Sequence, residues 1–225
     1  GVNSGWAAST YELVASLAND GTNLYAGTAN SNGDGEVWRW NGTAWTKIGG
    51  DGINSGWSTN QGDGVYSMAF SAGQLYSGLY DTGGDGLFYR WNGTAWTRIG
   101  GGYFNESWGF FGLQSVESSA NFNSRLYMGT GVTTPGAAMV WEYDGSTWSV
   151  VGGQGVRGSW AADTYENVFT LQSFGGDLYA GLGSTGNDAE VWRYNGTSWT
   201  QVGGDSLNSS WAAGFETVNA LTPYQ

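Results

Sequence analysis

Several residue types that carry enzyme chemistry are missing from this chain. Its 225 residues include no histidine and no cysteine. Their absence excludes Ser-His-Asp and Cys-His nucleophile systems, histidine-ligated zinc and disulfides. Paired carboxylates would still allow glycosidase chemistry. A catalytic site normally breaks repeat symmetry, however, and most acidic residues here follow a repeat or lie in turns. We therefore predict that the protein is not an enzyme and needs no cofactor.

Positive charge, proline and long apolar runs are also scarce. Seven Lys and Arg residues face nineteen Asp and Glu residues, and the formal net charge is −12. No basic stripe exists to neutralise phosphates, so we predict no nucleic-acid partner. No apolar run approaches the roughly 18 residues of a membrane helix, so we predict no membrane insertion. The sequence starts at Gly1 without a signal peptide, as expected of a processed mature protein or an excised piece.

What the chain does contain is glycine and aromatic residues, arranged in four similar hairpins. Each has an aromatic-rich run, then Asn-Gly or Asp-Gly, then a second run that ends in Gly-Gly. The hairpins span residues 37–45, 88–96, 140–148 and 191–199. Asn-Gly and Asp-Gly tolerate positive φ at both central residues, so the pattern predicts tight type I′ turns.

A tryptophan recurs with the same period. The five residues, separated by 51, 51, 52 and 51 positions, are Trp6, Trp57, Trp108, Trp160 and Trp211. After each tryptophan comes a strand-like stretch, and after the first four also a turn, a Leu-Tyr strand, a polar loop and an aromatic hairpin. Four antiparallel strands in about 50 residues predict an all-β, β-propeller-like fold. A β-solenoid is the alternative, although its coils are usually shorter.

The repeat count is uneven. We predict one repeat domain over residues 1–225, with repeats at 1–50, 51–101, 102–153 and 154–204 and a partial repeat at 205–225. This gives four four-stranded blades plus one extra strand. An unpaired strand is a template for association, so we expect residues 205–225 to find a sheet edge, within the chain or in a homo-oligomer or filament.

The repeats resemble those of a known group of proteins. The pattern Leu-Tyr-small-Gly, then Val/Phe-Trp/Tyr-Arg, then Asn/Asp-Gly-Thr/Ser-x-Trp resembles blades of bacterial secreted and cell-surface β-propellers. It is distantly similar to sialidase-type and kelch-type blades. The sialidase Asp box, Ser/Thr-x-Asp-x-Gly-x-x-Trp, differs because Asn41 and its equivalents stand directly before glycine. The resemblance implies an extracellular or cell-surface protein, and such propellers include lectins, enzymes and scaffolds.

Two sets of repeated residues are candidates for ligand binding. Polar side chains begin the first strand of each repeat, at Glu12, Asp63, Gln114, Glu166 and Glu216. Near the mouth of a channel they would form a ring that holds a cation or sugar hydroxyls; hydrogen bonding at the strand entry is the alternative. The five repeat tryptophans, Trp6, Trp57, Trp108, Trp160 and Trp211, would stack on pyranose rings. Packing between blades explains their repetition as well.

A third repeated feature is an arginine in the aromatic hairpin. Arg39, Arg90 and Arg193 are equivalent, and Glu142 replaces the arginine in the third repeat, which departs most from the others. A repeated arginine between aromatic residues most often stacks or pairs between blades, although a sialidase-like arginine cluster is an alternative. The chain lacks an Asp-x-Asp-x-Asn-Gly calcium loop, and we predict no metal site.

These observations favour one function and leave two others open. The leading hypothesis is a non-catalytic, extracellular, carbohydrate-binding module of the lectin type, whose partner is a glycan or a cell-surface polysaccharide. The first alternative is a structural surface or fibre subunit that assembles through its spare C-terminal strand. The second is a glycosidase.

Overall fold

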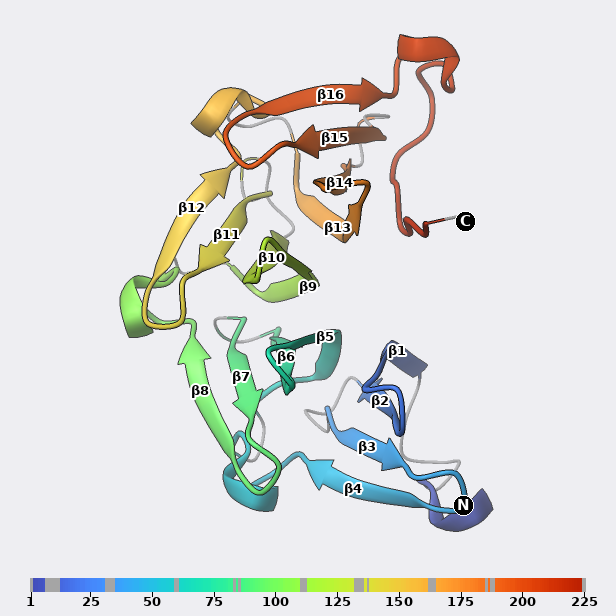
Figure 1. The fold of residues 1–225 in the computed structure, drawn as a ribbon, viewed down its shortest axis with the longest axis vertical. Coiled ribbons are helices and arrows are strands. Elements are labelled where there is room, and N and C mark those ends of the chain that lie inside the picture. Colours follow the sequence, from blue (N-terminus) through green and yellow to red (C-terminus); the bar gives the residue numbers. More distant parts are fainter. Residues whose placement is uncertain are drawn as a thin grey trace. The chain divides into compact units, whose positions relative to one another are not determined.

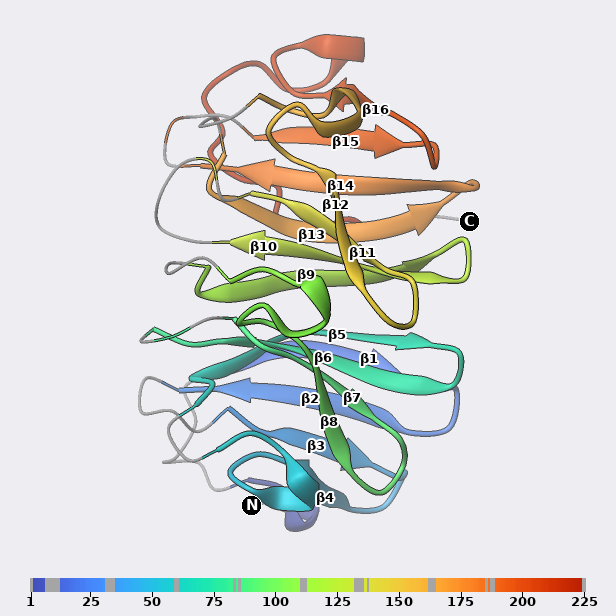
Figure 2. The same ribbon diagram turned by 90° about the vertical axis from the view of Figure 1, so that its left-hand side faces the viewer.

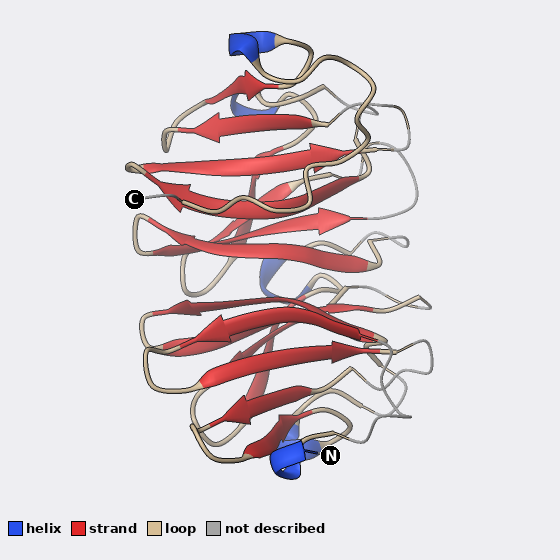
Figure 3. Ribbon diagram, turned by 90° about the vertical axis from the view of Figure 1, so that its right-hand side faces the viewer, coloured by secondary structure: helices blue, strands red, loops and turns tan. Residues whose placement is uncertain are grey.

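The protein is all-β. In the computed structural model, the described residues are 2–6, 13–30, 35–58, 61–82, 84, 86–109, 113–131, 136, 138–161, 165–184, 186 and 189–223. Within this part of the chain, no helix is long and apolar enough to cross a membrane. The only helical segments in it are short 3-10 turns, shown in blue in Figure 3: η1 (Val2–Ser4), η2 (Ile53–Ser55), η3 (Phe104–Glu106), η4 (Val156–Gly158) and η5 (Leu207–Ser209).

Sixteen strands occupy the described residues, and they follow the predicted repeat of four. The first repeat holds β1 (Leu13–Asn19), β2 (Leu24–Ala29), β3 (Val37–Trp40) and β4 (Trp45–Gly49). The second holds β5 (Gly64–Ser71), β6 (Gln74–Tyr80), β7 (Phe88–Trp91) and β8 (Trp96–Gly100). The third holds β9 (Ser115–Phe122), β10 (Arg125–Gly131), β11 (Val140–Tyr143) and β12 (Trp148–Gly152). The fourth holds β13 (Asn167–Phe174), β14 (Asp177–Gly183), β15 (Glu190–Tyr194) and β16 (Trp199–Gly203).

Consecutive strands of a repeat pair in antiparallel fashion, so each repeat contributes four neighbouring strands, called its sheet below (Figure 1). In the first repeat, for example, Leu24 lies opposite Trp40, and Trp40 lies opposite Trp45. Figure 2 shows the long β13–β14 hairpin of the fourth sheet side-on. Each aromatic hairpin also contains a register shift at its second residue, such as that between Val37 and Trp38. The four-stranded, antiparallel repeat predicted from the sequence is confirmed.

Glycine allows the first strand of one repeat to approach the second strand of the repeat before it. One residue pair joins these strands between successive repeats. The pairs are Ala29 with Gly64, Tyr80 with Ser115, and Gly131 with Asn167. A Cβ atom added to Gly27 would lie only 2.8 Å from the Cβ of Val65. Real Cβ atoms do not approach so closely, so a larger residue at position 27 would push the two strands apart.

The chain forms two compact units, Gly1–Val116 and Glu117–Gln225, and we describe each by itself. The core of the N-terminal unit contains Val37, Trp57, Val65, Leu79 and Trp96. The core of the C-terminal unit contains the equivalent residues Val140, Trp160, Val168, Leu182 and Trp199. The repeats therefore bury the same kinds of side chain at the same positions.

The hairpin loops differ from the predicted type I′ turns. Each loop has four residues, because Trp40 pairs directly with Trp45. Positive φ occurs at Gly42 (96°) but not at Asn41. The Asn41 side chain has another role: its Oδ1 accepts hydrogen bonds from the backbone N–H of Thr43 and Ala44, both at 2.9 Å, and from the Thr43 hydroxyl. This is an Asx turn, in which the side-chain amide oxygen accepts hydrogen bonds from backbone N–H groups of the four-residue loop.

The partial fifth repeat lies on the sheet of the fourth repeat. Thr217 forms a bridge with Gly183, the same contact that joins the complete repeats. The Val218 amide donates a hydrogen bond to the carbonyl of Leu182 at 3.1 Å. The predicted fifth strand does not form over the described residues 219–223, because the first strands of the other repeats pair mainly with a second strand of their own repeat. Tyr224 and Gln225, at the end of the predicted strand, lie outside the described residues.

Candidate functional site

The three repeat tryptophans that have a complete repeat on either side are buried. Trp57, Trp108 and Trp160 are at most 3% exposed. Each indole N–H donates to a backbone carbonyl 22 residues earlier, as Trp57 does to Gly35 at 2.9 Å. The rings of Trp57 and Trp96 meet edge to face, with centroids 5.8 Å apart. These three side chains therefore have no face open to a ligand in this structure.

The first and last repeat tryptophans are half-buried. Trp6 packs edge-on against Trp38 and Trp45, with centroid distances of 5.9 and 5.2 Å. Trp211 donates its indole N–H to the carbonyl of Ala189 at 2.9 Å. Their contacts match those of the buried tryptophans, so all five occupy one kind of packing position.

Two members of the predicted ring of polar side chains, Asp63 and Gln114, make contacts at the strand entries. In the N-terminal unit, Asp63 accepts hydrogen bonds from the amide (2.8 Å) and hydroxyl (2.6 Å) of Thr82. Gln114 donates to the carbonyl of the same threonine at 3.3 Å. In the C-terminal unit Glu166 is half-buried and Glu216 is exposed. Glu12 lies outside the described residues. Within the described part of the chain, no three acidic residues cluster to hold a metal ion.

A cavity of about 530 Å³ opens elsewhere in the N-terminal unit, between the first and second sheets. It lies at the turn ends of these sheets and is lined by residues of the β1–β2, β5–β6 and β7–β8 turns and of the strands beside them. Its walls combine three aromatic residues, Tyr25, Phe70 and Trp91, with Arg39 and a set of carboxylate and amide groups. The acidic and amide residues are Asn19, Asp20, Asn23 and Asn92.

The polar groups of this cavity are held in place by hydrogen bonds. Asp20 accepts from the backbone N–H of Thr22 at 2.8 Å and of Asn23 at 2.6 Å, and from the hydroxyl of Tyr25 at 2.8 Å. Partial burial acts to raise the pKa of Asp20, but these hydrogen bonds outweigh it and hold the pKa well below its usual range. Burial, together with the hydrogen bond to Asp20 and the negative charge of Asp20, raises the pKa of Tyr25 to about 12. Around neutral pH the pair is therefore a carboxylate and a neutral phenol.

Arg39 supplies the positive charge. It lies opposite Tyr25 in the β2–β3 pairing and lines the cavity. Among the described residues, its Nε is buried without a hydrogen-bond partner, and the same holds for the equivalent Arg90 and Arg193. This feature therefore belongs to the repeat, and Arg39 is distinguished by lining the cavity. The sequence predicted stacking or pairing between blades for this repeated arginine. Arg193 instead approaches an acidic residue of its own repeat, with its Nε 3.9 Å from Asp177.

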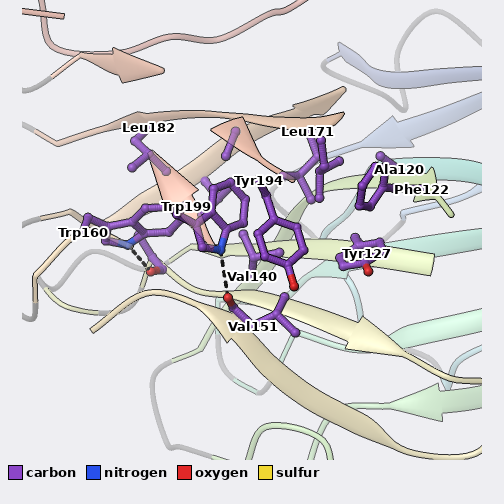
Figure 4. Close-up of a cluster of buried hydrophobic side chains, with 14 of the residues drawn as sticks. Ala120, Phe122, Tyr127, Val140, Val151, Trp160, Leu171, Leu182, Tyr194 and Trp199 are labelled. Carbon is purple, nitrogen blue, oxygen red and sulfur yellow. Dashed lines mark hydrogen bonds between the residues drawn. The ribbon is translucent and has the colours of Figure 1, made fainter. Parts of the chain in front are cut away.

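The equivalent place in the C-terminal unit is filled by side chains. Phe122 stands four residues before the Leu-Tyr pair, as Asp20 does, and is only 4% exposed. Figure 4 shows Phe122, Tyr127 and Tyr194 gathered there, and their ring centroids are 5.6 to 6.3 Å apart. Glu142, in the place of Arg39, accepts hydrogen bonds from Arg125 and from the Tyr127 hydroxyl.

Sequence reasoning missed most residues of this cavity. Asp20 lies in an irregular turn and belongs to no motif, while Trp91 belongs to a hairpin whose repetition indicates a structural role. A signal was nevertheless present. When the repeats are aligned on their Leu-Tyr pairs, Asp20 of the first repeat corresponds to Phe122 of the third, and Arg39 corresponds to Glu142. The charge at both positions therefore differs between the two repeats.

Comparisons with known proteins identify the fold. No known family model matches the sequence, and no curated protein matches it. Among solved structures, a SapL1 lectin in complex with α-methyl fucoside is 14% identical, with a TM-score of 0.54 over 85% of this chain and 63% of the lectin. An α-L-arabinofuranosidase from Clostridium thermocellum is 13% identical, with a TM-score of 0.51 over 82% and 70% of the two chains. A Trypanosoma rangeli sialidase in complex with sialic acid is 14% identical, with a TM-score of 0.53 over 82% and 36%.

This chain thus spans less than two thirds of the lectin's length and about a third of the sialidase's. At such low identity the likeness concerns the fold alone. It confirms an all-β, β-propeller-like architecture for this chain. The same architecture carries a lectin in one neighbour and hydrolases in two others, so the function must be argued from the site.

Proposed function

We propose that this protein is a non-catalytic, extracellular, lectin-like module that binds a neutral sugar in the cavity between its first and second sheets. The observation that carries the proposal is the lining of that cavity. Aromatic rings lie beside an arginine and several amide and carboxylate oxygens. A pyranose offers the matching groups, because its C–H face packs on aromatic rings while its hydroxyls take donors and acceptors.

The charges of the site favour a neutral sugar over an acidic one. Arg39 brings one positive charge, but Asp20 brings a negative charge to the same cavity. The chain as a whole carries a formal net charge of −12, which repels polyanions. A sugar with adjacent hydroxyls would accept from Arg39 and donate to Asp20 without bringing a charge of its own.

Binding without catalysis is supported by the count of acids. Glycosidases act with two carboxyl groups placed across the scissile bond. Asp20 is the one carboxylate among the described residues that line the cavity, and it already accepts several hydrogen bonds within the protein. We therefore expect a bound glycoside to be released unchanged.

A glycan array followed by calorimetry tests this proposal. Arg39→Met should weaken binding of the best glycan at least about ten-fold, since it removes a charged hydrogen-bond donor. Arg193→Met is the matched control, because Arg193 holds the same repeat position but does not line the cavity. The proposal fails if the array shows no ligand, or if both variants bind like the parent.

Assembly through the C-terminal segment is the second candidate function. Three exposed apolar side chains of β1 favour it: Leu13 (46% exposed), Val14 (44%) and Leu17 (61%). Val65 and Val168, the equivalents of Val14, are fully buried. We infer that the exposed face and residues 205–223 promote association between copies. Light scattering would show oligomers for the intact chain and monomers after deletion of residues 205–225; a monomeric intact chain would exclude this role.

A further inference from the structure

A second cavity of the N-terminal unit, about 190 Å³ in volume, lies at the opposite ends of the same strands. Its walls come from the end of β2, the start of β5 and the end of β6. The lining residues are Leu13, Ala29, Asn30, Asp63, Tyr66, Tyr80 and Thr82. The cavity shares no residue with the proposed sugar site, so a ligand bound here would be independent of that site.

The chemistry of this cavity is that of one carboxylate beside two aromatic rings. Asp63 is only 9% exposed, and Thr82 fixes its Oδ2 through two hydrogen bonds. The rings of Tyr66 and Tyr80 lie 5.0 Å apart at an interplanar angle of 53°. Gly64 leaves room for this pair, because a Cβ atom there would lie 2.6 Å from the Tyr66 ring. Two inclined rings and a fixed carboxylate thus face a single small space.

The tyrosine pair departs from the repeat. The equivalents of Tyr66 are Ala15, Glu117 and Phe169. The equivalents of Tyr80 are Ala29, Gly131 and Gly183. Phe169 is the one aromatic residue among these equivalents, and no other repeat has two rings at these positions, so the fold does not require two tyrosines here. A feature that the architecture does not require, placed around a nearly buried carboxylate, points to a ligand.

We propose that this cavity binds a small organic cation of the alkylammonium class. Aromatic faces attract a cation through their quadrupoles, and inclined rings hold a methylated ammonium group better than a single ring does. Asp63 supplies the opposite charge at a site largely removed from water, where such attraction is strongest. The net charge of −12 also raises the local concentration of cations around the protein.

Choline and its neutral isostere 3,3-dimethylbutan-1-ol test the proposal. The two probes share shape and hydroxyl, and they differ in the positive charge. Calorimetry on the full chain should show choline binding at least about ten-fold more tightly than the alcohol. Equal affinities, no binding of choline, or binding of a neutral sugar that competes with choline would overturn the proposal.

Two variants place the binding in this cavity. Asp63→Asn removes the charge but keeps an oxygen that accepts from Thr82, and Tyr66→Leu removes one ring; each should weaken choline at least about five-fold. Glu166→Gln, at the position equivalent to Asp63 in the C-terminal unit, is the control and should bind choline like the parent. Unchanged affinity in folded Asp63→Asn and Tyr66→Leu proteins would contradict the assignment, as would an equal loss in the control.

Discussion

The first and third repeats use the same strands to make different surfaces at their turn ends. In the first repeat Asp20 and Arg39 line an open cavity next to the second repeat. In the third repeat the same positions are held by Phe122, which is buried, and Glu142, which is bound by Tyr127 and Arg125. The strand pairing around these positions is alike, with Tyr25 opposite Arg39 and Tyr127 opposite Glu142.

This difference separates what the fold needs from what a ligand needs. The contacts of the buried hairpin tryptophans are the same in both units. The indole N–H of Trp96 donates to the carbonyl of Ile48, and that of Trp199 donates to the carbonyl of Val151, both at 2.8 Å. At the turn ends the lining differs between the two repeats, from open and charged to closed and aromatic. The fold therefore tolerates either lining, and the open one is the better candidate for function.

The largest effect is expected where the two units agree. Trp57→Ala and Trp160→Ala should each lower the free energy of unfolding by about 3–5 kcal/mol, because each removes a buried ring and an indole hydrogen bond. Thermal unfolding followed by circular dichroism measures both. A variant with a parental melting temperature and no glycan binding would show instead that the tryptophan acts in recognition.

A smaller effect is expected in the hairpin loops. Gly42→Val and Gly145→Val should each cost more than about 1 kcal/mol, since these glycines have φ values of 96° and 107° that a β-branched residue resists. Chemical denaturation compares the two directly. If both variants were as stable as the parent, the positive φ at these loops would be ruled out.

The smallest expected effect on stability concerns the side chain that accepts the hydrogen bonds of the hairpin loop. Asp144 replaces asparagine in the third repeat, and hydrogen bonds from Thr147 and Ser146 lower its pKa to about 2. Because the folded-state pKa lies below the usual value, the stability it contributes is present above about pH 4. That contribution is lost as the pH falls toward 2.

Melting temperatures measured between pH 2 and 5 test this effect. In Asp144→Asn the acceptor remains but no longer titrates, so the variant should lose less stability than the parent as the pH falls. The same slope in both proteins would mean that Asp144 contributes nothing to the acid sensitivity.

The sequence predicts much of this architecture because its signals are local and repeated. The Leu-Tyr pairs and the aromatic runs lie in strands, as the spacing indicates. The predicted turn type is wrong because backbone dihedral preferences alone do not decide the loop, and Asn41 acts through its side-chain oxygen. The cavity could not be located from motifs, because it joins Asp20 in one turn to Trp91 in another hairpin, and only the folded sheets bring them together.

Whether the open cavity of the first repeat binds a glycan can be tested with an Asp20→Phe variant. This change gives the first repeat the residue that fills the same place in the third, so it should close the cavity between the first two sheets. We expect glycan affinity measured by calorimetry to fall at least about ten-fold in a protein that still folds, while the melting temperature falls because Phe cannot accept the hydrogen bonds that Asp20 accepts. A folded Asp20→Phe protein that binds the glycan with parental affinity would contradict the assignment of the sugar site to this cavity.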